Sequence, residues 1–287
     1  MTEEKNKVQK STLYLVGTPI GNLSDLSERA IKVLTEVDFI AAEDTRNSLR
    51  LLSVLGIKNE LISYHEHNKK VSGERLVARL LGGESCALIT DAGMPAISDP
   101  GEDIVKLCAD AGITVSVIPG PCAAVSALAV SGLATTRFVF EGFLSAQKSE
   151  RRNRLKELET EQRTIIFYEA PHKLKATLED MSAAFGGERK ISLCREITKL
   201  NEEIMRTTMG SAVSYYNANE PRGEYVLIVE GFDGEVVCDE LQYLLSLTPE
   251  EHVEKYVNEG MSKMEATKKA AKDRGMSKSE LYKILNT

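Results

Sequence analysis

Glycines and prolines cluster in short segments that directly follow apolar, strand-like runs of the sequence. In the first such segment, residues 16–23, Gly17 and Gly21 stand four positions apart and would let backbone amides approach a ligand closely. The spacing is not GxGxxG, and no Lys-Ser/Thr pair follows a GxxxxG, so a nucleotide-triphosphate loop is not predicted. Taken alone, the segment is equally consistent with a tight turn between a strand and a helix.

Two further loops carry groups that a small ligand could contact. In residues 90–101 the carboxylate of Asp91 could accept a hydrogen bond from a ribose hydroxyl or an amine, or it could simply cap the next turn. In residues 118–124, Pro121 suits the first turn of a helix built from small residues. Loops that follow parallel strands meet at one edge of the sheet, where open α/β sheets bind ligands. The three loops together therefore predict a small-molecule cleft.

The elements that must position these loops alternate along the chain. Runs rich in β-branched residues, each followed by a turn and a helical pattern, indicate a mostly parallel sheet covered by helices, at residues 13–16, 39–42, 86–90 and 114–118. A second set, with some antiparallel strands expected, covers residues 138–143, 164–168, 190–194 and 225–230. Beyond Phe232 the pattern is helical, with Pro249 at a predicted helix start and Gly260 and Gly275 as stops.

The predicted fold class is therefore α/β. We expect two α/β domains at residues 1–134 and 135–235 and a small all-helical module at residues 240–287, which suits a length of 287 residues. Hydrophobic residues make up 42% and charged residues 28% of the chain, which excludes disordered, collagen-like and disulfide-scaffold classes.

The cysteines and the apolar segments of the sequence are used to predict the cellular compartment of the protein. Five cysteines, among them Cys238, stand far apart and form no CxxC, which predicts reduced thiols and a cytoplasmic protein. The first sixteen residues lack the apolar core and cleavage site of an export signal. The uncharged stretch 111–136 is broken by Pro119, Gly120 and Pro121, so we expect a strand, a turn and a buried helix there, and no membrane span.

Charge is unevenly distributed. Lys and Arg total 36 against 43 Asp and Glu, a net charge of −7, so a globally basic nucleic-acid surface is excluded. Residues 148–156 nevertheless carry five basic side chains, which could neutralise phosphates or simply form a solvated helix face.

The carboxyl-terminal segment 261–287 is the second basic region. It carries seven basic and three acidic residues, a net charge of +4 against −11 elsewhere. Ala271, Gly275 and Leu281 occupy the small, turn and apolar positions of a helix-turn-helix, with Ile284 one turn further on the same face. The pattern indicates either contact with nucleic acid or a plain helical packing module.

Eight ordered motifs resemble those of the tetrapyrrole methylase superfamily, whose members bind S-adenosylmethionine between two α/β domains. They run from about residue 12 to residue 232 and read GTPIGNLSDL, AAEDTR, YHEHN, TDAGMPAISDPG, IPGP, FYEAPH, CREITK and RGEYVLIVEG. At two positions the chain departs from the family's pattern, with Met94 in place of Thr and Cys122 in place of Ser. Backbone contacts to a cofactor would survive both changes.

The resemblance is closest to family members that methylate the ribose 2′-oxygen of a cytidine in the decoding region of 16S rRNA. It implies that activity, the small ribosomal subunit as the partner that carries the substrate, and a homodimer. It also implies a set of residues around S-adenosylmethionine: Thr18, Pro19, Asp91, Ala92, Gly93, Met94, Cys122, Ala123, Tyr168, Arg195 and Val226.

Methyl transfer requires the hydroxyl oxygen in line with the sulfonium–carbon bond, and a base can take the hydroxyl proton. Titratable side chains in the shared motifs are the candidates for that base, namely Asp44, His65, Glu169 and His172. Each has an ordinary alternative: Asp44 could cap the helix that carries residues 48–55, and Glu169 and His172 could fix the turn at Pro171. His65 and His67 form an HxH pair without a third ligand nearby, so no metal site is predicted.

With rRNA as the implied partner, the basic side chains become candidate phosphate ligands. These candidates are Arg46, Lys148, Arg151, Arg152, Lys272 and Lys278. Two other functions stay open: a methyltransferase of the same fold that acts on a tetrapyrrole or a protein, and a ligand-sensing regulator that reads DNA with a helix-turn-helix. The first leaves the basic segments unexplained, and the second rests on the helix-turn-helix pattern alone.

Overall fold

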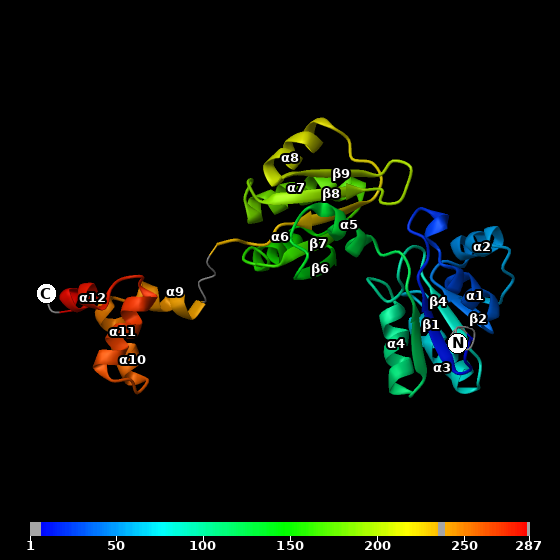
Figure 1. Ribbon diagram of the computed structural model, residues 1–287, viewed down its shortest axis with the longest axis horizontal. Helices are drawn as coiled ribbons and strands as arrows, with labels where there is room; N and C mark the ends of the chain where they lie inside the picture. The colour runs from blue at the N-terminus through cyan, green and yellow to red at the C-terminus, as the bar shows by residue number, and fades with distance from the viewer. Residues whose placement is uncertain (1–6, 235–238, 286–287) are drawn as a thin grey trace. The chain divides into compact units, whose positions relative to one another are not determined.

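The computed structural model describes residues 7–234 and 239–285, and Cys238 lies outside them. The chain divides into two compact units, residues 1–232 and 233–287 (Figure 1). The larger unit contains both sheets, and the smaller one contains the last helices. The domain boundaries at 134 and 235 stay a prediction, since contacts separate the chain at residue 232.

The first sheet contains five parallel strands in the order β3-β2-β4-β1-β5. Its elements are β1 Thr12–Val16, α1 Glu28–Glu36, β2 Phe39–Ala42, α2 Thr45–Val54, β3 Leu61–Ser63, α3 Lys69–Leu81, β4 Cys86–Ile89, α4 Gly101–Asp110 and β5 Thr114–Ile118. Because β4, β1 and β5 are neighbours, the three glycine- and proline-bearing loops that follow them leave the same edge of the sheet, as the sequence predicts.

Helices cover both faces of the first sheet. One face packs Val16 and Ile40 against Leu34 of α1 and Leu52 of α2. The other packs Leu13, Phe39 and Leu88 against α3 and α4, through residues such as Leu76 and Ile104. Strand side chains alternate between these two clusters, and burial on both faces explains why the strands read as continuous apolar runs.

The second sheet is mixed and has the order β6-β7-β10-β8-β9. Only β6 and β7 run parallel, and the other pairs are antiparallel. Its elements are β6 Phe138–Phe143, α6 Lys148–Glu157, β7 Thr164–Glu169, α7 Pro171–Phe185, β8 Lys190–Arg195, β9 Glu203–Thr208, α8 Met209–Ala218 and β10 Tyr225–Val229.

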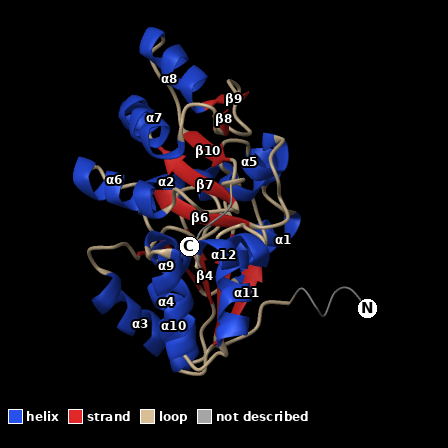
Figure 2. Cartoon of the chain, turned by 90° about the vertical axis from the view of Figure 1, so that its left-hand side faces the viewer, coloured by secondary structure: helices blue, strands red, loops and turns tan. Residues whose placement is uncertain are grey.

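Helix α5 (Ala123–Ser131) precedes the second sheet in the chain but packs against it. Its Ala127 and Leu128 contact Ile166, Val226 and Ile228 on one face of that sheet. Helices α6, α7 and α8 cover the opposite face, and Figure 2 shows α5 and α7 on either side of the strands. Helix α5 therefore carries the chain from the binding edge of the first sheet to the second sheet.

The smaller unit is helical, as predicted: α9 Asp239–Ser246, α10 Pro249–Asn258, α11 Lys263–Asp273 and α12 Lys278–Ile284. Ala271 and Leu281 are buried in its core, and Gly275 turns the chain between α11 and α12 with a φ of +66°. Ile284, three residues beyond Leu281 in α12, is 45% exposed and is not part of the buried core.

Eight of the strands match their predicted runs to within a residue or two, and β3 and β9 were missed. Strand β3 has only three residues, and β9 (EIMRTT) is a polar edge strand, so neither shows the apolar signal on which strand prediction depends. In the described part of the chain no helix is both long and apolar enough to cross a membrane.

Arg151 corrects one of the RNA-binding predictions. Its side chain is 7% exposed, and its Nη2 lies 2.6 Å from Oδ2 of Asp180, which is itself buried on α7. Its Nε donates to the same oxygen, and its Nη1 donates to the carbonyls of Ser145 and Ala146. A guanidinium with these partners ties α6 to α7 and has no face left for a phosphate. Arg152, also bound to Asp180, keeps 57% of its side chain exposed.

We expect Arg151→Ala to lower the free energy of unfolding by about 3–5 kcal/mol, because it leaves the buried carboxylate of Asp180 without its buried ion-pair partner. Arg152→Ala is the matched control and should cost about 1 kcal/mol or less, since the Arg152 side chain is largely exposed and Arg151 still pairs with the carboxylate. Burial alone would raise the pKa of Asp180, but the two arginines hold it below its usual value. The stabilisation is therefore present at neutral pH and is lost as the pH falls through that lowered pKa. Urea unfolding at pH 7 measures the free energy of unfolding of both variants. Equal losses of stability in Arg151→Ala and Arg152→Ala would contradict the argument that burial makes the first ion pair stronger.

Candidate functional site

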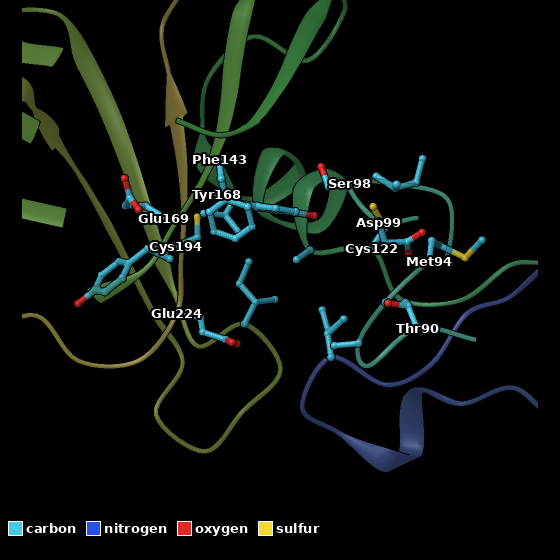
Figure 3. A pocket seen from close by; sticks show the side chains of 18 of the residues that line it. Thr90, Met94, Ser98, Asp99, Cys122, Phe143, Tyr168, Glu169, Cys194 and Glu224 are labelled. Atoms are coloured by element: carbon cyan, nitrogen blue, oxygen red, sulfur yellow. The ribbon is translucent and has the colours of Figure 1, made fainter. Parts of the chain in front are cut away.

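A cavity of about 300 Å³ lies in the larger unit, between the loops of the first sheet and one end of the second sheet. Figure 3 shows Met94, Asp99 and Cys122 on one side of it and Phe143, Tyr168 and Glu224 on the other. The volume is at the lower end of the range of small-molecule sites. The cavity lies at the carboxyl ends of β4 and β5, where the three loops were predicted to converge.

Backbone contact between the loops shapes the first wall of the cavity. A Cβ on Gly120 would stand 2.8 Å from Cα of Gly17, and one on Gly17 would stand 2.7 Å from Cα of Gly120. Thr18 and Gly93 exchange backbone hydrogen bonds of 2.9 and 3.2 Å, which joins the loop after β1 to the loop after β4. Gly93 has a φ of +87°, which favours glycine. The three loops therefore form one packed backbone layer.

The two departures from the family's pattern have different local consequences. The Sδ atom of Met94 accepts a hydrogen bond of 3.2 Å from the backbone N–H of Gly120, so this side chain joins the packed loops. Cys122 is the N-cap of α5 and makes no side-chain capping bond. Both residues line the cavity.

The second sheet supplies an aromatic and apolar wall. The ring of Tyr168 lies between Phe140 and Phe143, with centroids 5.1 and 5.5 Å away, and its hydroxyl accepts from the N–H of Ala124 at the start of α5. Burial raises the pKa of Tyr168 to about 12, so the ring stays neutral. Val226 and Cys194 complete the wall from β10 and β8.

The charged lining is acidic. Five carboxylates contribute to it, namely Glu43, Asp99, Glu169, Glu196 and Glu224, whereas Lys199 is the only cation among the lining residues that the structure describes. Such a lining suits a positively charged ligand and disfavours an anion.

Asp99 differs from the other lining carboxylates in its hydrogen bonding. Its Oδ1 accepts from the N–H groups of Ala96 and Gly101 at 2.8 and 2.7 Å. Its Oδ2 is buried and has no hydrogen-bond partner among the described residues. Burial raises the pKa of Asp99 and outweighs the N–H groups of Gly101 and Ala96 and the nearby hydroxyl of Thr90, which all act in the opposite direction. This oxygen is therefore a hydrogen-bond acceptor that no described residue uses.

The cavity gathers most of the cofactor positions that the resemblance implies. Those that line it are Ala92, Gly93, Met94, Cys122, Ala123, Tyr168 and Val226. Thr18, Pro19, Asp91 and Arg195 do not line it. Thr18 is buried beneath the loop after β4, where its hydroxyl donates to the carbonyl of Thr90. Asp91 accepts a hydrogen bond from Asn47, and Arg195 pairs with Glu203.

The four candidate bases differ in their position relative to the cavity and in their hydrogen bonds. Asp44 is the N-cap of α2, so its capping alternative is confirmed, and hydrogen bonds from Arg46 lower its pKa to about 2. Glu169 lines the cavity, but its oxygens already accept from Thr177 and from the N–H of Ala170. His65 and His172 do not line it. The catalytic roles of Asp44, His65, Glu169 and His172 therefore stay predictions. Asp99, which the sequence analysis does not name as a base, also lines the cavity.

His65 and His67 are neighbours in space. Their ring centroids are 5.9 Å apart, and within residues 7–234 and 239–285 no group of three or more His, Cys, Asp or Glu side chains could hold a metal ion.

The basic candidates other than Arg151 lie on the surface. Arg46 is 85% exposed and pairs with Asp44. Lys148 is exposed at the start of α6, and Lys272 and Lys278 are exposed on α11 and α12. These side chains remain available to a phosphate, and their role in binding RNA stays a prediction.

Several lining residues had no individual signal in the sequence. Ile97, Ser98 and Asp99 lie in the long loop after β4 that was singled out as a whole, whereas Glu196, Ile197 and Lys199 follow β8, a strand of the second set. The CREITK motif contains the latter group, although the resemblance assigns none of these three residues to the cofactor.

The sequence matches the family model described as "Tetrapyrrole (Corrin/Porphyrin) Methylases" over residues 12–213. A protein of Halalkalibacterium halodurans named "Ribosomal RNA small subunit methyltransferase I" is 50% identical over 275 residues, which cover 96% of this chain and 94% of that protein. Proteins of the same name from Bacillus subtilis and Escherichia coli O157:H7 are 48% and 44% identical, covering 96% and 94% of this chain and 94% and 93% of their own lengths.

The chain belongs to the tetrapyrrole methylase family. Solved structures agree at the level of the fold. A diphthine synthase superposes with a TM-score of 0.61 at 14% identity, covering 77% of this chain and 90% of its own. A cobalt precorrin-4 methyltransferase superposes with a TM-score of 0.58 at 17% identity, covering 77% of this chain and 95% of its own. The prediction of two α/β domains of the tetrapyrrole methylase type is confirmed.

Family members of this type use S-adenosylmethionine, and the cavity fits that molecule. S-adenosylmethionine carries a positive sulfonium and an ammonium group, which suit the carboxylates of the lining. Backbone atoms at Gly93 and Ala123 border the cavity and can contact its polar groups, whereas Tyr168 and Val226 offer apolar surface.

We expect Gly120→Ala to weaken S-adenosylmethionine binding at least tenfold, because the new methyl group would force the loops after β1 and β5 apart. Gly187→Ala is the control, since its Cβ would meet nothing closer than 3.9 Å. Gly93→Val should also block binding, because valine strains a backbone with a φ of +87°. Calorimetric titration measures the affinity of all three variants for S-adenosylmethionine. Wild-type affinity in Gly120→Ala would contradict the role of the close approach between Gly17 and Gly120.

Proposed function

We propose that this protein transfers the methyl group of S-adenosylmethionine to the ribose 2′-oxygen of a cytidine in 16S rRNA within the small ribosomal subunit. The observation that carries the proposal is the acidic cavity, which is lined by most of the positions assigned from the rRNA methyltransferase motifs. Relatives named ribosomal RNA small subunit methyltransferase I, 42–50% identical over nearly the whole chain, support the same activity.

The chemistry divides between the cofactor and the protein. The cofactor, when bound, supplies an electrophilic methyl group on a sulfonium. The chain's own part is to hold the reacting groups in line, and the packed loops at Gly17, Thr18 and Gly93 provide a rigid wall for this purpose. Tyr168 and Phe143 supply apolar surface on the opposite side of the cavity.

Asp99 is the base that the geometry favours. Asp99 lines the cavity, its buried Oδ2 makes no hydrogen bond among the described residues, and its raised pKa strengthens its attraction for a proton. In this role Asp99 takes the proton of the 2′-hydroxyl as the new carbon–oxygen bond forms. The carboxylate must be ionised to act, so activity should fall as the pH drops through its raised pKa.

RNA binding is assigned to basic side chains outside the cavity. Arg46, Lys148, Arg152, Lys272 and Lys278 are exposed and can contact phosphates. The last two belong to the helical unit, whose segment 261–287 carries the net charge of +4. We propose that this unit docks the enzyme on its substrate. The homodimer and the cytoplasmic location stay predictions from the resemblance and the cysteine pattern.

The direct test incubates the protein with methyl-labelled S-adenosylmethionine and unmethylated small ribosomal subunits, followed by nucleoside analysis. We expect label in 2′-O-methylcytidine, and Asp99→Asn should lower kcat at least tenfold while cofactor affinity is retained. Label on a base or on a ribosomal protein would contradict the proposal. Label only in an added tetrapyrrole would favour a same-fold methyltransferase, and operator binding without transfer would favour a DNA-binding regulator.

The same assay tests the helical unit. Removing residues 240–287 should leave the larger unit folded, because each unit has its own hydrophobic core. Cofactor affinity and melting temperature should then persist while KM for small subunits rises. Full methylation at low subunit concentration would contradict docking, and loss of the fold would show that the helices serve packing instead.

A further inference from the structure

Lys199 stands apart within the cavity because of its charge. It is the one cation among the described lining residues, facing a lining with five carboxylates. The acidic groups suit the sulfonium and the ammonium of the methyl donor, but they repel the phosphates of an RNA strand. A nucleotide whose ribose enters the cavity must bring at least one phosphate with it. The lining offers that phosphate a single group of opposite charge.

Lys199 is held between two carboxylates. Its Nζ lies 2.9 Å from Oε1 of Glu196 and 2.7 Å from Oε2 of Glu224. The two partners differ in exposure, because the side chain of Glu196 is 20% exposed and that of Glu224 is 80% exposed. The Glu224 pair is therefore solvated and weak, so its carboxylate can leave at little cost. Glu196 also accepts from the N–H of Glu224 and is the fixed member of the pair.

The backbone around Lys199 is specialised to place it. Glu196 and Thr198 have φ values of +50° and +67°, which are costly for residues other than glycine. A Cβ on Gly21 would stand 2.3 Å from Cγ of Lys199, and one on Gly223 would stand 2.5 Å from Cγ of Glu196. The loop after β8 thus packs tightly against the loop after β1 and keeps the lysine at the cavity.

Lys199 also keeps its charge. Burial alone would lower its pKa, but the hydrogen bonds to Glu224 and Glu196 outweigh that effect, and the pKa lies above its usual value. The side chain is therefore an ammonium ion at any pH at which the enzyme would be assayed.

We propose that Lys199 binds a phosphate of the RNA strand beside the target nucleotide, exchanging the carboxylate of Glu224 for that phosphate while Glu196 stays in place. The inference rests on the proposed function and adds the residue by which an acidic cavity admits an anionic substrate. The exchange preserves the number of charge-assisted hydrogen bonds on Nζ. It also removes a carboxylate from the path of the RNA.

The main test is Lys199→Met, which keeps the aliphatic stem that packs on Gly21 and removes the charge. We expect KM for small ribosomal subunits to rise about tenfold, with cofactor affinity unchanged. The slope of log affinity against log salt concentration should fall by about one unit, the value for one phosphate contact. Lys190→Met is the matched control, since that lysine also pairs with a glutamate but does not line the cavity. It should leave KM and the slope at their wild-type values.

Two further variants separate phosphate binding from a structural role. Lys199→Arg should restore most of the affinity, because it retains the cation, and Glu224→Gln should lower KM, because it removes the competing carboxylate. An unchanged salt slope in Lys199→Met, or a higher KM in Glu224→Gln, would overturn the proposal. Absence of 2′-O-methylation by the wild-type protein would instead refute the proposed function, and direct binding of labelled 16S rRNA would still report the salt slope.

Discussion

The site depends on backbone contact between loops that follow neighbouring strands. Gly17 and Gly120 approach so closely that neither position has room for a side chain, and the paired hydrogen bonds between Thr18 and Gly93 join a third loop to the layer. Only a parallel sheet with β4, β1 and β5 side by side brings these loops together. The cavity is consequently a property of the fold, and its side chains decide the chemistry performed there.

Positive and negative charges are separated both along the chain and among the side chains that line the cavity. Across the chain, basic residues concentrate in segment 261–287 while the remainder is strongly acidic. Within the cavity, carboxylates dominate, and Lys199 is the single cation among the described lining residues. This separation suits an enzyme with a cationic methyl donor and a polyanionic substrate, because each ligand meets its own complementary surface.

The sequence predicts the fold well where apolar patterning is strong. Strands such as β2 and β4 match their predicted runs because every residue in them is buried and apolar. Strands β3 and β9 are too short or too polar to show that pattern. Side-chain roles are harder to predict. Arg151 belongs to a basic run but forms a buried ion pair with Asp180, and Asp99 and Lys199 gain their significance only from tertiary packing.

The central claim is that the methyl donor occupies the cavity between the packed loops and the second sheet. The most direct measurement is a crystal structure of the protein with S-adenosylhomocysteine, the product of methyl transfer. We predict that the product lies against Gly93, Ala123 and Val226, with Asp99 and Lys199 beside the space left for the ribose. Electron density for the product at any other place, with this cavity filled only by water, would contradict the claim.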